Sequence, residues 1–261
     1  MIESITIVGG HGRSGAPEPV RQIELKMGNV VSIVGPTGSG KTTLINDIEL
    51  LANGNTPTGR RILINGDIAP SAYRYDPAQN PIALITQHTN FLSDLPVYKF
   101  LETHARIRNK TAQGVDALID QVLSFANQLT GEPIILTSRM TELSGGQTRA
   151  LLIADATIIC DTPIVLLDEV ENAGIHRTRA LQLLREHKKI FLFVTHDPRI
   201  VLLSDFRIIM REGSVAEVLT TNQDEKMLSV GVSALDDTLC QLRDKLRWGK
   251  RLRVEDLEVL A

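Results

Sequence analysis

Short, nearly continuous apolar runs alternate along the chain with longer stretches in which apolar residues recur every three or four positions. Runs of Ile, Val and Leu with few polar interruptions are typical of strands that are covered on both faces of a sheet. The alternation of such runs with helical patterns predicts an α/β fold. The expected strands are Ser4–Val8, Val20–Leu25, Val30–Val34, Ile62–Ile64, Ile82–Thr86, Ile164–Leu167, Ile190–Val194 and Phe206–Met210.

The strand pattern almost stops between Gln87 and Leu143. In this interval the stretches Val97–Arg108 and Val115–Leu129 carry apolar residues at helical spacing. We therefore expect a helical lobe, about residues 88–148, inserted into the α/β core.

A second helical pattern lies in the C-terminal segment, residues 216–261. Its leucines recur at four-three-four spacing, which puts them in one stripe along a helix, and several basic residues lie beside them. Two interpretations remain open: the helix packs on its own domain with a solvated basic face, or it docks on a partner or an acidic surface. The leucines are Leu235, Leu239, Leu242 and Leu246, and the bases are Arg243, Lys245, Arg247, Lys250, Arg251 and Arg253.

Composition excludes several classes of protein. A chain of 261 residues with 43% hydrophobic residues can bury a full core, so it is not a disordered tail. The net charge of −3, with acids and bases interspersed, favours no nucleic acid partner. The longest apolar runs have five residues, far short of the roughly 20 that cross a bilayer. The N-terminus lacks a secretory pattern. The two cysteines, Cys160 and Cys240, indicate the reducing cytoplasm, and we expect Cys160 to be buried as a small apolar residue.

Residues 35–42 read GPTGSGKT and match the phosphate-binding loop pattern between an expected strand and an expected helix. Backbone N–H groups and the helix N-terminus can surround a polyphosphate, while Lys41 neutralises its charge and Thr42 holds Mg²⁺. A chance glycine turn is the alternative, which the strand and helix disfavour. The expected nucleotide-binding residues are Gly35, Pro36, Thr37, Gly38, Ser39, Gly40, Lys41, Thr42 and Thr43.

Two further stretches suit the same chemistry. The strand IVLL delivers Asp168 and Glu169 at its end; in isolation such acids are usually solvated, but beside a phosphate loop Asp168 can hold Mg²⁺ and Glu169 can orient the attacking water. LSGGQ opens a helical pattern with Ser144, Gly145, Gly146 and Gln147. This is either an ordinary helix N-cap or a second anion-binding helix terminus.

Together, GPTGSGKTT, LSGGQ and IVLLDE resemble the ATP-binding cassette (ABC) ATPase family over residues 1 to about 215. The resemblance implies a P-loop NTPase core with a mostly parallel sheet, an N-terminal antiparallel β subdomain and the helical lobe. It implies ATP and Mg²⁺ as ligands. It also gives functions to two residues that would otherwise be structural: Gln87 contacts Mg²⁺ and couples the lobe, and His196 contacts the γ-phosphate.

The resemblance further implies that two copies, or this chain and a similar one, dimerise head to tail on ATP binding. Three departures from the family pattern stand out. No aromatic residue lies between Val8 and Gln22 to stack on adenine, which leaves His11 or Arg13, or a mobile loop. Asp155 stands where arginine is common. Finally, the segment that follows Glu169 lacks the usual aspartate, and we hypothesise that His176 tunes coupling between the two ATP sites.

The resemblance implies an Mg²⁺-dependent ATPase and leaves open the task that hydrolysis drives. One hypothesis is the energy-coupling subunit of a transporter, cytoplasmic and peripheral at the inner face of the membrane, with separate membrane subunits. The other is a soluble ATPase that remodels or matures a protein partner. A nucleotide-gated module without hydrolysis is disfavoured because Glu169 and His196 are both present.

Overall fold

The computed structural model describes residues 1–86, 88–89, 91, 93–108, 114–168, 177–254 and 256, and for 177–180 the backbone alone. Its strands are β1 (Ser4–Val8), β2 (Gln22–Lys26), β3 (Val30–Val34), β4 (Arg61–Ile64), β5 (Asp67–Ile68), β6 (Ile82–Ile85), β7 (Ile164–Asp168), β8 (Ile190–Val194), β9 (Phe206–Arg211) and β10 (Ser214–Thr220). Its helices are α1 (Lys41–Glu49), α2 (Ala72–Tyr75), α3 (Val97–Ile107), α4 (Val115–Leu129), the 3₁₀ helix η1 (Met140–Glu142), α5 (Gly145–Ile158), α6 (Arg177–Glu186), α7 (Pro198–Leu203) and α8 (Gln223–Arg247).

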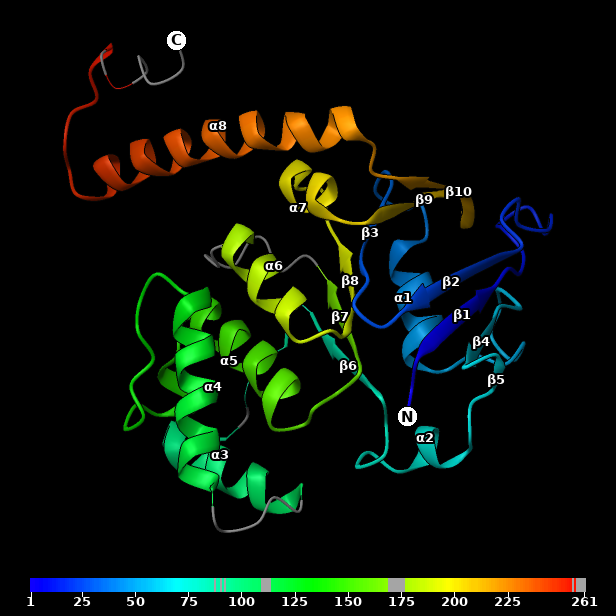
Figure 1. The fold of residues 1–261 in the computed structure, drawn as a ribbon, viewed down its shortest axis with the longest axis horizontal. Helices are drawn as coiled ribbons and strands as arrows, with labels where there is room; N and C mark the ends of the chain where they lie inside the picture. The colour runs from blue at the N-terminus through cyan, green and yellow to red at the C-terminus, as the bar shows by residue number, and fades with distance from the viewer. Residues whose placement is uncertain are drawn as a thin grey trace.

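The strands form two sheets (Figure 1). The larger has the order β10-β9-β3-β8-β7-β6, in which only the β10–β9 pair is antiparallel. The smaller, β2-β1-β4-β5, is antiparallel throughout. The α/β fold with a mostly parallel core sheet and an N-terminal antiparallel subdomain is therefore confirmed.

Both faces of the larger sheet are covered, as the apolar strands predict. Along β7, Val165 and Leu167 join a core with helices α3, α4 and α5, whereas Ile164 and Leu166 join a core with α1 and the antiparallel sheet. The expected eight strands all form, with ends that shift by up to two residues. β10 was not expected because a register shift between Val215 and Glu217 interrupts its alternation of apolar and polar residues.

Helices α3 and α4 lie within the segment expected to form a lobe, and they pack against each other and against α5 at one end of the molecule (Figure 1). In the part of the chain that the structure describes, no helix combines the length and the apolar character needed to cross a membrane.

Helix α8 runs along the outside of the molecule beside α7 (Figure 1). It is attached by ion pairs from Arg199 to Asp236 and from Arg207 to Glu225. Its leucine stripe is not the packed face, because Leu235 and Leu239 are each 50% exposed and Leu246 is 57% exposed. The helix therefore packs on its own domain, as one of the two interpretations expected, but these three leucines do not lie on the packed face.

Candidate functional site

Three parallel strands present the predicted chemistry at one edge of the larger sheet. Ile33, Val194 and Asp168 form a single row across β3, β8 and β7. Because neighbouring strands are roughly 4.8 Å apart, Asp168 lies about 10 Å from the end of β3. The carboxyl ends of parallel strands are where α/β folds bind ligands. This row brings the phosphate loop, the Asp168 strand end and the turn that holds His196 to one edge.

The phosphate loop, residues 35–42, connects β3 to α1. Lys41 is buried at the start of α1, and its Nζ donates to the carbonyls of Gly35, at 2.8 Å, and Pro36, at 3.1 Å. The ammonium group is therefore held over the loop that would surround a phosphate. The next two residues, Thr42 and Thr43, are exposed, so their hydroxyls are open to a ligand.

Two glycines of the loop are required by close approach as well as by backbone conformation. Gly35 has φ +153°, and a Cβ there would lie 2.4 Å from the Met210 carbonyl oxygen. Gly40 has φ +102°, and a Cβ there would lie 2.9 Å from the Cα of Gly213. The turn between β9 and β10 thus packs directly against the loop, and side chains at either position would displace it.

Ser39 contributes a buried hydroxyl group to the phosphate loop. Its hydroxyl oxygen is buried and has no hydrogen-bond partner among the residues that the structure describes. Buried polar groups are normally paired, so an unpaired one calls for an explanation. A ligand seated in the loop would supply such a partner.

A buried ion network that no sequence motif indicates holds helix α1 in place behind the phosphate loop. Arg60 is fully buried and donates to Glu18, at 2.5 Å, and to Asp47 of α1, at 2.9 Å. It also donates to the Gly213 carbonyl at 2.8 Å. The network therefore ties α1, the N-terminal loop and the β9–β10 turn together behind the phosphate loop.

The network shifts the pKa values of its members. Burial by itself would raise the pKa of Glu18, but hydrogen bonds from Arg60 and from the backbone N–H groups of Gly10 and Val215 lower it below the usual 4.5. Burial opposes the charge of Arg60 as well, and its carboxylate partners Glu18 and Asp47 outweigh that effect and raise its pKa. Both groups are held charged. No spacing rule links residues from three separate segments, which is why the sequence pattern missed them.

The LSGGQ segment begins α5 and uses its side chains as a capping box. The Ser144 hydroxyl accepts from the Gln147 backbone N–H at 3.3 Å, and the Gln147 side chain accepts from the Ser144 N–H at 2.9 Å. The N-cap alternative is thus correct for these side chains. The N–H groups of Gly145 and Gly146 have no hydrogen-bond partner within the described residues, so the exposed helix start still offers donors.

The phosphate loop and this helix start are separated across the sheet. The loop follows β3, whereas α5 packs beside β6, which is three strands further along. The two predicted phosphate-binding elements therefore lie at different places on one chain.

His196 is exposed in the turn after β8, and the turn is fixed by its neighbours. Asp197 caps α7 by accepting from the Arg199 N–H at 2.9 Å, and the Arg199 guanidinium contacts both Asp197 and Asp236 of α8. The position of His196 is thus coupled to the C-terminal helix. Three predicted residues, Gln87, Glu169 and His176, lie outside the described part of the chain.

The N-terminal loop places Arg13 against the phosphate loop. The Arg13 guanidinium donates to the Gly38 carbonyl at 2.5 Å, and its backbone N–H donates to the Glu212 carbonyl at 3.0 Å. His11 is exposed two residues earlier in the same loop, and its backbone N–H donates to the Thr58 carbonyl at 2.7 Å. Of the two residues considered for adenine, Arg13 is the one in contact with the loop.

Comparison with solved structures supports the fold. An ATP-binding cassette of an ABC transporter, solved in its ADP conformation, aligns with a TM-score of 0.61 and 20% identity over 87% of this chain and 94% of that chain. A dimeric ATP-binding cassette bound to ADP and Pi aligns with a TM-score of 0.61 and 23% identity over 84% of this chain and 99% of that chain.

Comparison with known sequences identifies the family. A methionine import ATP-binding protein of Cupriavidus pinatubonensis is 28% identical over 82% of this chain, which spans 65% of that relative's length. An uncharacterized ABC transporter ATP-binding protein of Methanocaldococcus jannaschii is 46% identical over 260 residues, which cover 100% of this chain and 98% of the relative. The family model described as ABC transporter matches residues 21–172. The chain therefore belongs to the ABC transporter family, as one of its ATP-binding proteins.

Proposed function

We propose that the chain binds ATP with Mg²⁺ at the carboxyl edge of β3, β8 and β7 and hydrolyses it. The observation that carries this proposal is the row of Ile33, Val194 and Asp168, which brings the phosphate loop and Asp168 to the same edge. Family membership supports ATP hydrolysis as the reaction.

Each group has a role that follows from its chemistry. Lys41 exchanges its two loop carbonyls for phosphate oxygens, and the loop N–H groups hold the phosphate chain. The Thr42 hydroxyl and the Asp168 carboxylate are oxygen donors of the kind Mg²⁺ prefers, and the ion, when bound, neutralises charge that develops on the phosphates. On the family pattern, Gln87 contacts the ion, Glu169 orients the attacking water and His196 contacts the γ-phosphate.

Adenine recognition falls to Arg13 in this proposal. A guanidinium plane can stack on a base, and that of Arg13 already contacts the phosphate loop at the Gly38 carbonyl. The Gly38 contact fixes the side chain in that position before ATP binds.

We further propose that the active unit is a dimer in which each ATP lies between the phosphate loop of one copy and residues 144–147 of the other. The separation of these two elements on one chain supports this arrangement, because the loop follows β3 whereas α5 packs beside β6, three strands away. The dimeric cassette with ADP and Pi is a structural precedent.

We propose that ATP hydrolysis by this chain supplies the energy of a transporter. The chain would lie in the cytoplasm and bind separate membrane subunits at the inner face of the membrane. The names of the relatives support it, since they are ATP-binding proteins of ABC transporters, including an importer. The second candidate is a soluble ATPase that remodels or matures a protein. It draws on Asp155, which bonds to His104 of α3 where the family commonly has a basic residue.

Affinity purification from the native organism distinguishes the two tasks. A Glu169→Gln variant trapped with ATP should retain polytopic membrane proteins if the chain serves a transporter. Recovery of soluble proteins alone, from a membrane fraction solubilised in mild detergent, would contradict the transporter role. A Lys41→Ala variant purified in parallel identifies contacts that do not depend on nucleotide.

A further inference from the structure

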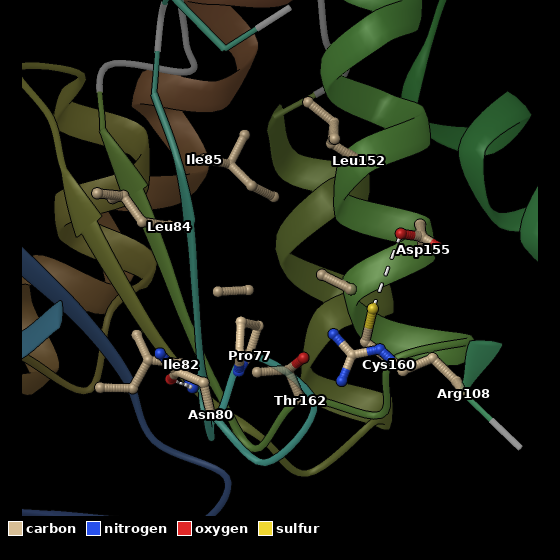
Figure 2. Close-up of a pocket in the computed structure, with 12 residues that line it drawn as sticks. Pro77, Asn80, Ile82, Leu84, Ile85, Arg108, Leu152, Asp155, Cys160 and Thr162 are labelled. Carbon is tan, nitrogen blue, oxygen red and sulfur yellow. Dashed lines mark hydrogen bonds between the residues drawn. The ribbon is translucent and has the colours of Figure 1, made fainter. Parts of the chain in front are cut away.

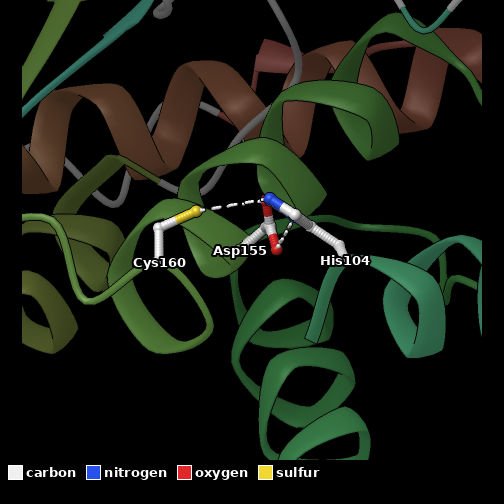
Figure 3. Close-up of side chains that lie close together, drawn as sticks. All are labelled: His104, Asp155 and Cys160. Atoms are coloured by element: carbon white, nitrogen blue, oxygen red, sulfur yellow. Dashed lines mark hydrogen bonds and ion pairs between the residues drawn. The ribbon is translucent and has the colours of Figure 1, made fainter. Parts of the chain in front are cut away.

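Three side chains with metal-binding atoms meet where the helical lobe joins the core. His104 lies on α3, Asp155 on the last turn of α5, and Cys160 two residues beyond that helix. Their ligand atoms all lie within 4.8 Å of one another (Figure 3). The sequence pattern assigned Cys160 to the apolar core, but in the structure it lies next to these two polar groups and is only partly buried.

Backbone hydrogen bonds hold Asp155 and Cys160 close together. The N–H groups of Ile159 and Cys160 both donate to the Asp155 carbonyl, at 3.0 and 2.9 Å, which closes the end of the helix over Asp155. The Asp155 carboxylate, in turn, lies 2.9 Å from His104 Nδ1 and fixes the orientation of the ring. The ring orientation leaves His104 Nε2 facing the Cys160 sulfur.

The contacts of the Cys160 sulfur with His104 and Asp155 are long. Cys160 Sγ lies 3.9 Å from His104 Nε2 and 3.8 Å from Asp155 Oδ2. A thiol is a weak donor, so contacts of this length contribute little as hydrogen bonds. Ligands bound at roughly 2.0–2.3 Å to a tetrahedral zinc ion lie about 3.3–3.6 Å apart. The distance of 3.8 Å from Sγ to Asp155 Oδ2 is slightly longer than this range, and the distance of 2.9 Å from the Asp155 carboxylate to His104 Nδ1 is slightly shorter.

The set of donors selects the class of metal. A thiolate, an imidazole and a carboxylate are the three side-chain ligands that zinc uses. Mg²⁺ and Ca²⁺ take oxygen ligands and have little affinity for sulfur, so the ion that accompanies ATP does not suit this cluster.

A cavity of about 300 Å³ adjoins the cluster between β6 and α5 (Figure 2). Asp155 and Cys160 line it, together with Arg108, whose guanidinium donates to the Ala78 carbonyl at 3.0 Å. A metal held by three protein side chains keeps a position for water or another ligand, and this cavity gives that position access to solvent.

The cluster is separate from the ATP site. Cys160 precedes the first residue of β7, Ile164, whereas Asp168 is the last residue of that strand. From Ile164 to Asp168 the strand rises by roughly 13 Å, so the two sites lie toward opposite ends of β7. We propose that His104 Nδ1, an Asp155 carboxylate oxygen and Cys160 Sγ bind one zinc-class transition metal ion, with an open coordination position toward the cavity between β6 and α5. The ion would link α3 of the lobe to α5.

Cobalt binding tests this site without any reading of ATPase activity. The purified chain is stripped with a chelator and titrated with Co²⁺ in the absence of nucleotide and Mg²⁺. We expect one equivalent of Co²⁺ to give a thiolate-to-metal charge-transfer band and the visible bands of a tetrahedral ion, both abolished by added Zn²⁺. Metal binding should also raise the thermal midpoint, because it crosslinks two helices.

Variants of the cluster, with a matched cysteine control, test which side chains bind the metal. Cys160→Ser should remove the charge-transfer band, whereas Cys240→Ser, which alters the exposed thiol of α8, should leave it unchanged. His104→Gln should weaken Co²⁺ binding at least tenfold while the far-ultraviolet circular dichroism shows a folded protein. The absence of a charge-transfer band in the wild type, or its persistence in Cys160→Ser, would overturn the proposal and reduce the cluster to a structural ion pair.

Discussion

Asp168 and Val194 lie opposite each other in the parallel pair of β7 and β8. Val194 also pairs with Ile33 of β3, two residues before the phosphate loop begins. The residues proposed to bind the metal and the phosphates of ATP, namely Asp168, the phosphate loop and His196, therefore all follow or end strands that meet in one row of the sheet. The sheet itself, rather than any single loop, sets their spacing.

Replacement of Lys41 should abolish nucleotide binding. Lys41→Ala removes the ammonium that lies over the loop carbonyls, and the phosphate charge would then be left uncompensated. We expect the Kd for ATP, measured by equilibrium dialysis, to rise by at least about 100-fold, which corresponds to roughly 2.8 kcal/mol. The control is Lys26→Ala, because Lys26 is exposed and forms an exposed ion pair with Glu24. Equal ATP binding by the two variants would contradict the role of Lys41.

Gly40→Ala should distort the phosphate loop, in addition to straining the backbone at residue 40. Gly15 provides the control, since it also has positive φ but a Cβ there would have no atom within 4 Å. Both variants should lose about 1–2 kcal/mol of stability because a left-handed conformation is strained for alanine. Only Gly40→Ala should also weaken ATP binding, through the clash with Gly213. Identical ATP affinities for the two variants would argue against a tight contact between the loop and the β9–β10 turn.

Removing the charge of Arg60 should be strongly destabilising. Arg60→Met leaves Glu18 and Asp47 buried without their cation. Breaking a buried pair from one side costs about 3–5 kcal/mol. Urea unfolding should show this loss, whereas Arg106→Ala, which breaks an exposed pair with Glu102, should cost less than about 0.5 kcal/mol. A small loss for Arg60→Met would mean that the network does not hold α1.

Acid should weaken the fold through Glu18. Its pKa in the folded state is lower than 4.5, so below that value the unfolded chain binds more protons than the folded one. The stability contributed by the Glu18 charge is therefore fully present above pH 4.5 and falls as the pH drops through the lower folded-state pKa. Urea midpoints of Glu18→Gln should start lower at neutral pH and change less below pH 4.5 than those of the wild type. The exposed Glu24→Gln serves as control, and parallel curves for wild type and Glu18→Gln would exclude this contribution.

The leucine stripe of α8 should tolerate polar substitution. Leu235 and Leu239 are each half exposed, so changing both to Gln should shift the free energy of unfolding by less than about 1 kcal/mol. The buried Leu151 of α5 is the comparison, and Leu151→Ala should cost about 2–5 kcal/mol. A large loss for the α8 variant would show that the stripe is packed in solution.

Local patterns predicted the elements whose signal lies within one segment. The phosphate loop, the strand that ends at Asp168 and the helix that starts at residue 145 each have a sequence signature that spans fewer than a dozen residues. The groups that were missed depend on contacts between distant segments. Arg60 meets Glu18 across 42 residues and His104 meets Asp155 across 51, so no periodicity could reveal either.

Phosphate release from ATP by the purified chain is the decisive measurement for the proposed hydrolysis, with wild type and Glu169→Gln compared side by side with and without Mg²⁺. We predict that the wild type turns over ATP only when Mg²⁺ is present, and that Glu169→Gln binds ATP with unchanged affinity but releases no phosphate. Hydrolysis by Glu169→Gln at the wild-type rate, or turnover by the wild type that does not require Mg²⁺, would contradict the proposed site.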